Sequence, residues 1–376
     1  MSKLKLMTIL GTRPEIIRLS STIKACDKYF DHILVHTGQN YDFELNEIFF
    51  KDLGLRDPDY HLNSVGKNLG ETMGNIIAKS YDLIQKVKPD AVLILGDTNS
   101  SLSAISAKRL KCPIFHMEAG NRCWDWNVSE MINRKIVDHI SDINLPYTEN
   151  SRLYLLSEGI NGQTIFVTGS PMCEVIKDNL EKINSSKILE KLDLKKQGYI
   201  VLSSHREGNI DIEENFLNLM KTVNAIAEKY QLPIVFSMHP RSKKIIEAHK
   251  IILHPLVRAL PPFSFSDYIN LQSNAYCVLS DSGTLSEESA MINFPAVLLR
   301  TSTERPEALE GGSIVIGNIT QHSVEQAVGM AVLMHKSGHN VLLRHDYLED
   351  NVSTKIIRII QSYTSIANIT TWNKKQ

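Results

Sequence analysis

The stretch LKLMTILGTRPEIIRLSSTI, residues 4–23, indicates the fold class. Residues 4–10 form an apolar run with the length and composition of a buried strand. The run ends at Gly-Thr-Arg, residues 11–13, and Pro14 then suits the first turn of a helix whose apolar residues recur at helical spacing. A buried strand that leads through a short polar turn into a helix predicts a parallel sheet with crossover helices.

The alternation of apolar runs and helical patterns continues along the whole chain. In the first half they fall at residues 33–35, 69–87, 91–95, 113–117, 131–139, 143–145 and 164–167. In the second half the runs restart at residues 199–203, 233–237, 276–279 and 295–299, and a last helix is expected near residues 354–363. We therefore predict an α/β protein of two Rossmann-like, doubly wound domains that face each other across a cleft. The expected domains are residues 1–180 and 181–376, with the last helix free to pack back on the first domain.

The composition and charge of the chain limit the classes of protein to which it can belong. With 376 residues, of which 43% are hydrophobic and 22% charged, the chain suits a globular protein of two domains. Its 41 Lys and Arg residues against 42 Asp and Glu residues give a formal charge of −1. Because no overall field would attract nucleic acid or an anionic membrane, neither is expected as a partner.

Cysteine usage and the N-terminal sequence favour a cytoplasmic protein. The five cysteines are an odd set without CxxC spacing, which argues against a disulfide framework and against structural zinc. The apolar run near the N-terminus is too short for a signal-peptide core or a membrane span. No GxGxxG, GxxxxGK[ST] or HExxH motif occurs, which weakens the NAD-dependent, P-loop and zinc-protease classes.

The unusual polar residues come directly after the predicted strands. Ligands of open α/β sheets bind beyond the carboxyl ends of the strands, where eight polar clusters of this chain fall. They are Gly11-Thr12-Arg13, Thr37-Gly38-Gln39, Asp97-Thr98, Glu118-Ala119-Gly120, His205-Arg206-Glu207, His239-Pro240-Arg241, Asp281-Ser282-Gly283 and Glu304-Arg305-Pro306-Glu307. A single Asp or Gly after a strand is usually turn chemistry, but eight clusters on one predicted face favour a ligand site.

The second half is predicted to hold an anion. Its clusters combine a turn before a helix, whose free backbone N–H groups suit a phosphate, with planar guanidinium groups and a carboxylate for ribose hydroxyls. The residues assigned to this role are Arg206, Ser282, Gly283, Glu287 or Glu288, and Arg305. No P-loop lysine or magnesium ligand set accompanies them, so neutralisation by Arg and His without a metal or cofactor is expected. The alternative is a plain capped helix with Glu in its first turn.

The first half is predicted to carry acid/base chemistry. Asp97 and Glu118 come after neighbouring strands, and Glu130 begins a predicted helix. Three carboxylates near one site repel one another, so at least one holds its proton near neutral pH and the group supplies both an acid and a base. The positive charges available to balance them are Arg13, Arg18, Arg122 and Arg134. The alternative is surface carboxylates that never meet.

Seven motifs, taken in order, resemble the non-hydrolysing UDP-N-acetylglucosamine 2-epimerase family over residues 4–360. They are Gly11-Thr12-Arg13-Pro14-Glu15, Thr37-Gly38-Gln39, Gly96-Asp97-Thr98, His116-Met117-Glu118-Ala119-Gly120, Ser204-His205-Arg206-Glu207, Asp281-Ser282-Gly283 and Thr303-Glu304-Arg305-Pro306-Glu307. The resemblance implies an isomerase of GT-B architecture, usually a homodimer, with UDP held mainly by the C-terminal domain. It assigns catalysis to Asp97, Glu118, Glu130 and His205, and adds Arg13, Arg18, Gln39 and Arg134 to the substrate-binding residues.

A finer resemblance concerns Asn121-Arg122-Cys123, where most of the family has Leu-Arg-Thr. Together with residues 18–21 and 168–172, it resembles the branch that makes UDP-N-acetyl-L-fucosamine from the L-talo epimer for capsule or O-antigen. The chain departs from the family at Met131, where a second Glu is usual, and at Gly208, where a charged residue precedes Asn. These departures leave open whether regulation by a second nucleotide sugar, known for some members, is kept.

The reaction that the resemblance implies can be understood from the chemistry of the sugar. No carbonyl lies beside C2, so direct removal of its proton is prohibitive, whereas departure of UDP from C1 makes that hydrogen acidic and gives a glycal. A carboxylate then protonates C2 from the opposite face while the diphosphate returns to C1, with no nicotinamide involved. The sequence does not assign which carboxylate acts on which face. The groups expected to stabilise the departing UDP are Arg13, His205, Arg206 and Arg305.

Other functions remain open from the sequence. The conversion of UDP-N-acetylglucosamine to UDP-N-acetylmannosamine is the alternative substrate pair. A GT-B glycosyltransferase shares the architecture but needs an acceptor, a hydrolysing epimerase releases free hexosamine, and a silent nucleotide-sugar sensor binds without turnover. Incubation with a nucleotide sugar alone separates these classes.

Overall fold

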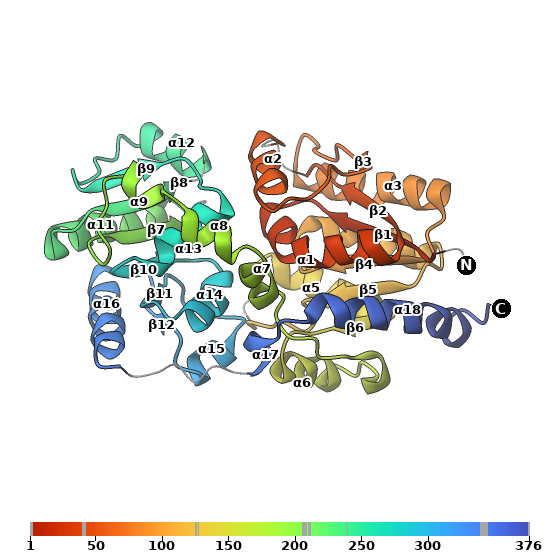
Figure 1. Ribbon diagram of the computed structural model, residues 1–376. Coiled ribbons are helices and arrows are strands. Elements are labelled where there is room, and N and C mark those ends of the chain that lie inside the picture. The colour runs from red at the N-terminus through yellow and green to blue at the C-terminus, as the bar shows by residue number, and fades with distance from the viewer. Residues whose placement is uncertain are drawn as a thin grey trace. The chain divides into compact units, whose positions relative to one another are not determined.

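The structure of the protein is a computed structural model that describes residues 3–39, 43–124, 126, 128–204, 209, 212–238, 240–338 and 345–374. The chain forms two compact units. The N-terminal unit comprises Met1–Asp178 and Leu348–Gln376, and the C-terminal unit comprises Asn179–Tyr347. Each unit is a parallel sheet flanked by helices (Figure 1).

The sheet of the N-terminal unit has the strand order β3-β2-β1-β4-β5-β6, and its strands pair in parallel. The strands are β1 (Lys5–Leu10), β2 (Asp31–His36), β3 (Tyr60–His61), β4 (Ala91–Leu95), β5 (Ile114–Met117) and β6 (Ile143–Leu145). The helices are α1 (Arg13–Tyr29), α2 (Phe43–Asp52), α3 (Leu69–Val87), η1 (Asn99–Leu102), α4 (Ser103–Arg109), α5 (Glu130–Ile140), α6 (Glu149–Ser157), η2 (Gly162–Thr164), α7 (Met172–Asp178) and α18 (Val352–Thr370).

The sheet of the C-terminal unit has the order β12-β11-β10-β7-β8-β9 and is also parallel. The strands are β7 (Ile200–Ser204), β8 (Ile234–Met238), β9 (Val257–Leu260), β10 (Cys277–Ser280), β11 (Ala296–Leu298) and β12 (Val315–Ile316). The helices are α8 (Leu180–Ser185), α9 (Ile188–Lys191), α11 (Glu213–Tyr230), α12 (Pro240–Ala248), α13 (Phe265–Ser273), α14 (Thr284–Ile292), α15 (Pro306–Glu310) and α16 (Gln321–Lys336). Helix α17 (His345–Leu348) includes the boundary at which the chain returns to the N-terminal unit.

Both sheets have the doubly wound order in which the third, second and first strands are followed by the fourth, fifth and sixth. The chain direction across the sheet therefore reverses between β1 and β4 in one unit and between β7 and β10 in the other. Ligands of such sheets bind beyond the carboxyl ends of the strands at this switch point. The predicted α/β class with two doubly wound sheets is confirmed.

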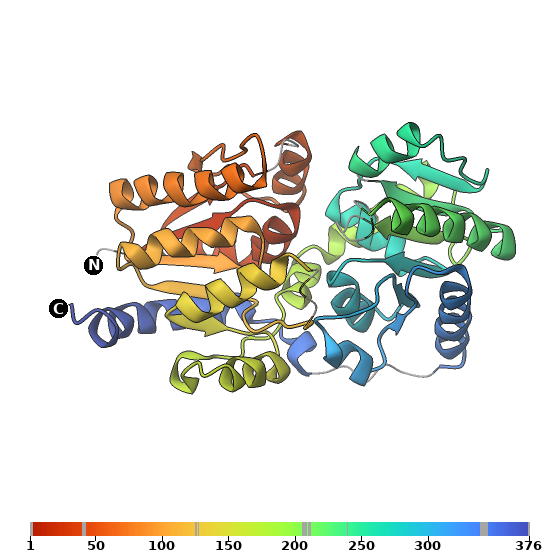
Figure 2. The same cartoon turned by 180° about the vertical axis from the view of Figure 1, so that it is seen from behind.

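Apolar side chains on both faces of each sheet hold the helices in place. Every residue of β4 is buried. Because helices cover a parallel strand on both sides, its sequence is a continuous apolar run. In the C-terminal unit, Ile200 and Leu202 belong to the core under α11 and α16, whereas Val201 belongs to the core under α13 and α14. In the N-terminal unit, α3, α4 and α5 cover one face (orange to yellow in Figure 2), and α1 and α18 cover the other.

The C-terminal helix α18 packs on the N-terminal unit. Its Tyr363 ring lies edge-on to Phe166, with the ring centroids 4.7 Å apart. The backbone N–H of Ser353 donates to Glu174 of α7 at 2.8 Å. The last residues of the chain thus complete the first unit that the chain builds.

The structure differs from the sequence predictions at the edges of the sheets. Residues 164–167 were expected to form a strand, but only Ile165 forms an isolated bridge, to Asn144 of β6. The strands β3, β9 and β12 were not predicted, because they have only two to four residues and lack a long apolar run. The predicted runs at 69–87, 91–95 and 143–145 coincide with α3, β4 and β6.

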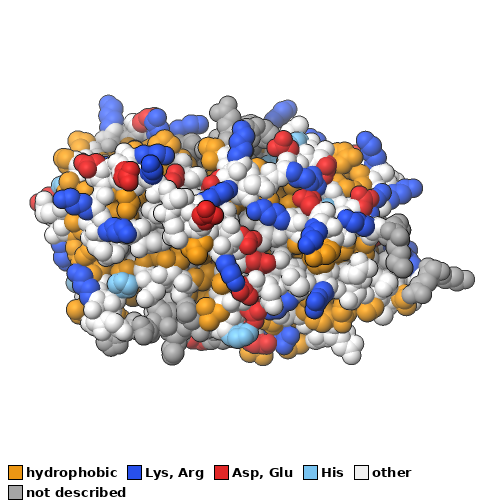
Figure 3. All heavy atoms as spheres, viewed as in Figure 1, with side chains coloured by type: hydrophobic (Ala, Val, Ile, Leu, Met, Phe, Trp, Pro, Cys, Tyr) orange, Lys and Arg blue, Asp and Glu red, His pale blue; other side chains and the backbone are white. Residues whose placement is uncertain are grey.

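The surface carries charges of both signs. On the face seen in Figure 3, acidic and basic side chains are interspersed, in keeping with the near-zero formal charge. All five cysteines lie in the described part of the chain, and none of them forms a disulfide. Among the described residues, no helix combines the length and apolar character that crossing a membrane requires.

Candidate active site

The turn after β1 carries a buried carboxyl group at the switch point of the N-terminal unit. Glu15, in the first turn of α1, accepts hydrogen bonds from the Gly11 backbone N–H at 3.0 Å and from the Thr12 hydroxyl at 2.7 Å. Burial raises the pKa of Glu15 to about 7, although these hydrogen bonds oppose the shift. Glu15 was not predicted as a site residue, because an acidic residue in the first turn of a helix is common. The sequence signal that could have identified Glu15 is its place in the Gly-Thr-Arg-Pro-Glu motif, residues 11–15.

Glu118 comes directly after β5 in a strained conformation. Its φ of 64° lies in the left-handed region, which a non-glycine residue seldom adopts and which is typical of functional sites. The carboxylate is buried, pairs with Arg18 of α1, and accepts a hydrogen bond from the Asn121 amide at 3.1 Å. A Cβ atom on Gly96 would lie 3.2 Å from Glu118 Oε2, so the carboxylate rests against the turn after β4.

Asp97, in the same turn after β4, is held by α5. Arg134 donates to Asp97 Oδ2 from Nε at 2.7 Å and from Nη2 at 2.6 Å. The Asn133 amide donates to the backbone carbonyl of Asp97 at 2.9 Å. The Asp97 side chain keeps 22% of its surface exposed, so it remains open to a substrate while its orientation is fixed.

The structure brings two of the three predicted carboxylates to neighbouring strand ends. Asp97 and Glu118 lie just beyond β4 and β5, which pair in register at Leu95 and Met117. Glu130 is the first residue of α5, one helical turn before the Arg134 that binds Asp97, and its side chain is half-buried. The Glu130 carboxylate accepts a hydrogen bond from the neighbouring Ser129 hydroxyl at 3.2 Å, so its approach to the other two carboxylates stays a prediction.

Three predicted substrate-binding residues of this unit also lie at strand ends or in α1. Arg13 begins α1, with its guanidinium carbon 5.6 Å from the centre of the Phe49 ring. Gln39 lies beyond the end of β2 and is partly buried. Arg18 pairs with Glu118, a candidate catalytic group, and its guanidinium carbon lies 6.0 Å from the centre of the Tyr147 ring.

A buried ionic network lies behind the two carboxylates. His116 contacts the Gly96 carbonyl through Nε2 at 2.8 Å and Asp138 through Nδ1 at 2.9 Å. Burial alone would lower the pKa of His116, but the hydrogen bond and the charge of Asp138 raise it. Asp138 also accepts from the Gly120 backbone N–H at 3.1 Å and from Arg122 at 2.8 Å. The network therefore fixes the turns on which Asp97 and Glu118 stand.

Arg122 does not have the role that the sequence predicted. It was expected to balance the candidate catalytic carboxylates, but its guanidinium group binds Asp138 and Glu158. Each Glu158 oxygen accepts from Arg122, at 2.9 and 2.7 Å. The prediction was wrong because the two acidic partners come from α5 and from the end of α6, which the sequence pattern does not place near residue 122.

The switch point of the C-terminal unit is built from hydroxyl groups and a glycine. Ser282 and Thr284 share a hydrogen bond of 2.9 Å between their hydroxyls at the start of α14. A Cβ atom on Gly283 would lie 2.8 Å from Glu304 Oε1, so a larger residue would collide with that carboxylate. Behind the turn, the fully buried Asp281 accepts from the Ser204 hydroxyl at 2.7 Å. The backbone N–H groups that begin α14 suit an anion.

The other predicted ligands of this unit make contacts within it. Arg305 pairs with Glu287 at 2.8 Å, and both side chains are essentially buried. Glu288 accepts from the Gln272 amide at 2.8 Å. Their predicted roles toward a nucleotide stay predictions. His205 and Arg206 lie outside the described residues.

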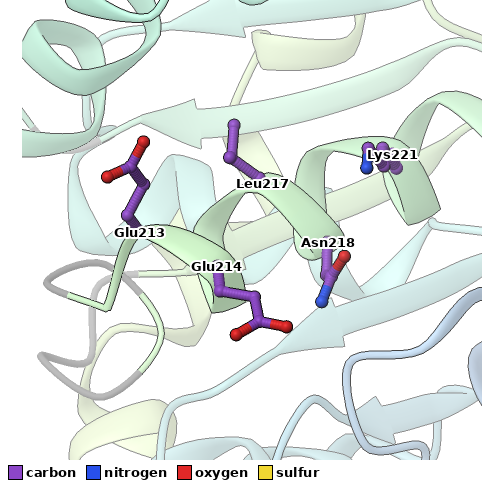
Figure 4. Close-up of a pocket in the computed structure, with 5 residues that line it drawn as sticks. All are labelled: Glu213, Glu214, Leu217, Asn218 and Lys221. Atoms are coloured by element: carbon purple, nitrogen blue, oxygen red, sulfur yellow. The ribbon is translucent and has the colours of Figure 1, made fainter.

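A shallow hollow of about 410 Å³ lies elsewhere on the C-terminal unit (Figure 4). It is lined by Glu213, Glu214, Leu217, Asn218 and Lys221. These residues all belong to α11, so among the described residues a single helix lines the hollow. Ligand sites are concave and mostly apolar, and this hollow contains none of the predicted site residues.

The two doubly wound sheets and the strand-end carboxylates suit an enzyme that uses acid/base chemistry. Among the described residues, no three His, Cys, Asp or Glu side chains gather in a way that suits a metal ion. The family model described as UDP-N-acetylglucosamine 2-epimerase matches residues 24–361. The chain belongs to this family and is an isomerase.

Similar proteins agree with this assignment. A structure of UDP-N-acetylglucosamine 2-epimerase from Rickettsia bellii is 45% identical, covers 99% of this chain and 100% of its own, and superposes with a TM-score of 0.90. The Methanocaldococcus jannaschii enzyme in complex with UDP-GlcNAc and UDP is 33% identical, with coverage of 95% and 99% and a TM-score of 0.89. UDP-2,3-diacetamido-2,3-dideoxy-D-glucuronate 2-epimerase from Pseudomonas aeruginosa is 32% identical over 86% of this chain and 91% of its own length. The fold is GT-B-like.

Proposed function

We propose that the protein is a non-hydrolysing 2-epimerase of a UDP-N-acetylhexosamine, in which UDP leaves C1 and returns through a glycal intermediate. The observation that carries the proposal is the pair of carboxylates, Asp97 and Glu118, at the neighbouring ends of β4 and β5. Membership of the family supports it, as do relatives that are 2-epimerases of UDP-sugars.

The proposed reaction balances without an outside oxidant or reductant. One carboxylate takes the proton from C2, the electron pair of the C2–H bond forms the C1–C2 double bond, and the C1–O bond breaks with its electrons on UDP. A protonated carboxyl on the opposite face then gives a proton to C2, and the diphosphate oxygen attacks C1. The acid and base are drawn from Asp97, Glu118 and Glu130.

The electrostatics of each unit suit its role. In the N-terminal unit, Arg18 and Arg134 hold Glu118 and Asp97 as oriented carboxylates. In the C-terminal unit, the N–H groups that begin α14 and the Ser282 hydroxyl are assigned to the diphosphate. His205, Arg206, Glu288 and Arg305 complete the proposed nucleotide-binding residues.

For the particular substrate, we propose UDP-2-acetamido-2,6-dideoxy-L-talose, which is converted to UDP-N-acetyl-L-fucosamine. The support is the sequence Asn121-Arg122-Cys123 after the Glu118 turn, which resembles that branch of the family. The same proposal carries the expectation of a cytoplasmic homodimer that serves capsule or O-antigen synthesis. The conversion of UDP-N-acetylglucosamine to UDP-N-acetylmannosamine is the alternative.

The test is to incubate the protein with each UDP-sugar alone and to monitor the sugar by NMR. The proposal predicts that the 6-deoxy L-talo substrate is epimerised faster than its 6-hydroxy counterpart, with no acceptor present. Preference for UDP-N-acetylglucosamine would favour the alternative substrate pair. Release of free hexosamine and UDP, or no change in either sugar, would contradict the proposed activity. A Glu149→Gln variant, altered at an exposed carboxylate of α6, serves as the matched control.

A further inference from the structure

We propose that Cys123 is a specificity-determining residue, whose thiol contacts the C6 methyl group of a 6-deoxy sugar and disfavours a hydroxyl group there. The inference rests on the proposed function and deepens it, because it names a residue that selects the substrate. Most of the family has threonine where this chain has Cys123. Because the reaction at C2 is common to the family, the replacement is expected to change which sugar is accepted and not the proton transfer.

The Cys123 thiol lies at one end of the guanidinium group that holds Asp97. Nε and Nη2 of Arg134 donate to Asp97 Oδ2 at 2.7 and 2.6 Å, whereas Nη1 faces Cys123 Sγ at 3.9 Å. One guanidinium group therefore separates the thiol from the carboxylate. In the proposed reaction the carboxylate acts at C2, and C6 is carried by C5, the ring atom opposite C2. A thiol placed in this way can reach the C6 end of the same sugar.

A second sulfur atom makes the surroundings of the thiol more apolar. Met131 Sδ accepts from the same Nη1 atom of Arg134 at 3.5 Å, and the Met131 side chain is 1% exposed. Cys123 is only partly buried, so of the two sulfur atoms its thiol is the one that a ligand can contact. Thiol and thioether groups are weak hydrogen-bonding partners and pack like small apolar groups. Soft apolar atoms thus lie against Nη1 where threonine and glutamate are usual in the family.

The position of Cys123 is fixed by its neighbours along the chain. Arg122, just before it, pairs with Asp138 of α5 at 2.8 Å, and both side chains are buried. The ring of Trp124, just after it, lies edge-on to Tyr154 of α6, with the ring centroids 5.9 Å apart. A site discriminates well only when packing and hydrogen bonds lock its side chains in place. The thiol is therefore held where an unfavourable contact with a ligand is not relieved by movement of the chain.

The chemistry at C6 sets how strong the selection can be. A C6 hydroxyl placed against the thiol loses hydrogen bonds to water and gains only weak ones, whereas a methyl group loses none. An apolar contact rejects an added hydroxyl modestly, by about 10- to 100-fold in kcat/KM. A threonine hydroxyl at position 123 can accept from Arg134 Nη1 and donate to the C6 hydroxyl, which removes the penalty.

The experiment compares Cys123→Val with Cys123→Thr, two side chains of nearly the same shape that differ in a methyl or a hydroxyl group. For each variant, kcat/KM is measured with the 6-deoxy and the 6-hydroxy UDP-sugar of the same ring configuration. We expect wild type and Cys123→Val to favour the 6-deoxy sugar by about 10- to 100-fold, and Cys123→Thr to accept both sugars within about threefold. Cys173→Thr, at the other partly buried cysteine, is the matched control and keeps the wild-type preference.

The ratio between the two sugars separates selection from stability, because any disturbance of packing is common to the valine and threonine variants. Equal ratios in Cys123→Val and Cys123→Thr overturn the inference, as does a wild-type protein that epimerises both sugars equally well. A wild-type protein that epimerises neither sugar instead contradicts the proposed function, so the two failures are distinct.

A crystal structure of the wild-type protein with the 6-deoxy UDP-sugar tests the contact without any substitution. The C6 methyl group is expected in van der Waals contact with Cys123 Sγ. A C6 methyl group that contacts other side chains and not Cys123 overturns the inference, whatever the activities of the variants.

Discussion

The two units share one strand order but differ in the side chains that the turns at the switch point carry. In the N-terminal unit the turns after β1, β4 and β5 place carboxyl groups there, namely Glu15, Asp97 and Glu118, with arginines on two of them. In the C-terminal unit the turn after β10 offers hydroxyls and backbone N–H groups at the start of α14. The same topology thus presents carboxyl groups in one unit and, in the other, hydroxyl and backbone N–H groups that we propose as the anion site.

In the proposed function, the shared strand order places both ligand sites at the carboxyl ends of the strands, and the side chains of the turns give each site its chemistry. In the proposed mechanism, the start of α14 attracts the diphosphate, and the carboxylates of the N-terminal unit move protons to and from C2 of the sugar. Substitutions in the first unit should therefore affect turnover, and substitutions in the second should affect nucleotide affinity. This contrast between the units is wrong if substitutions in the N-terminal unit weaken nucleotide binding and substitutions in the C-terminal unit lower turnover.

The largest effect is expected for the carboxylates of the N-terminal unit. Asp97→Asn or Glu118→Gln removes a proton acceptor without changing the size of the side chain. We expect kcat to fall about 10³-fold or more, while the dissociation constant for UDP, measured by calorimetry, changes little. Glu149→Gln should keep wild-type turnover. Full activity of either site variant would remove that residue from the mechanism.

A second prediction concerns Glu15 and the pH dependence of stability. The pKa of Glu15 is about 7 in the folded protein against an ordinary value of 4.5, so between these pH values the unfolded chain releases a proton that the folded protein keeps. The stability of the wild type therefore falls, relative to Glu15→Gln, as pH rises from 4.5 to 7, by about 3 kcal/mol. Above pH 7 the difference levels off.

Urea unfolding of both proteins across this pH range measures the difference. Gln retains an oxygen that accepts from Gly11 and Thr12, so the comparison isolates the charge. Stability curves that stay parallel from about pH 4.5 to about pH 8 would show that Glu15 titrates normally. The N-terminal site would then lack the buried proton that we assign to it.

The smallest effect is expected in the C-terminal unit. Gly283→Ala places a Cβ atom 2.8 Å from Glu304 Oε1 and disturbs the start of α14. We expect UDP affinity to fall about tenfold, with kcat at saturating substrate within about threefold of wild type. Gly329→Ala in α16, where an added Cβ meets nothing within 4 Å, is the control. A loss of kcat at unchanged affinity would reverse the contrast between the units.

Much of the fold could be predicted from the sequence because buried parallel strands are continuous apolar runs. Residues 91–95 became β4, and α3 begins after Asn68, whose side chain caps it by accepting from the Glu71 N–H at 2.9 Å. The edge strand β9 was missed because Val257–Leu260 includes an arginine and is only partly buried. A strand can therefore be predicted from the pattern of apolar residues only when it is long enough and buried.

For the candidate site, the sequence predicted that Asp97 and Glu118 follow neighbouring strands, but it did not predict their contacts. The strand-end rule located Asp97 and Glu118, since it depends only on where apolar runs stop. The pairing of Arg122 with Asp138, and of Asn121 with Glu118, depends on a left-handed turn and on the approach of α6. The spacing of residues along the sequence does not predict these tertiary contacts.

Epimerisation in heavy water tests elimination and re-addition of UDP on the unaltered protein. The protein is incubated with its UDP-sugar in D₂O, and the product is examined by NMR and mass spectrometry. The proposed mechanism predicts deuterium at C2 of the product, with the sugar still joined to UDP. An epimerised product that carries no deuterium at C2 would show that the C2–H bond is not broken in this way, and the mechanism would be wrong.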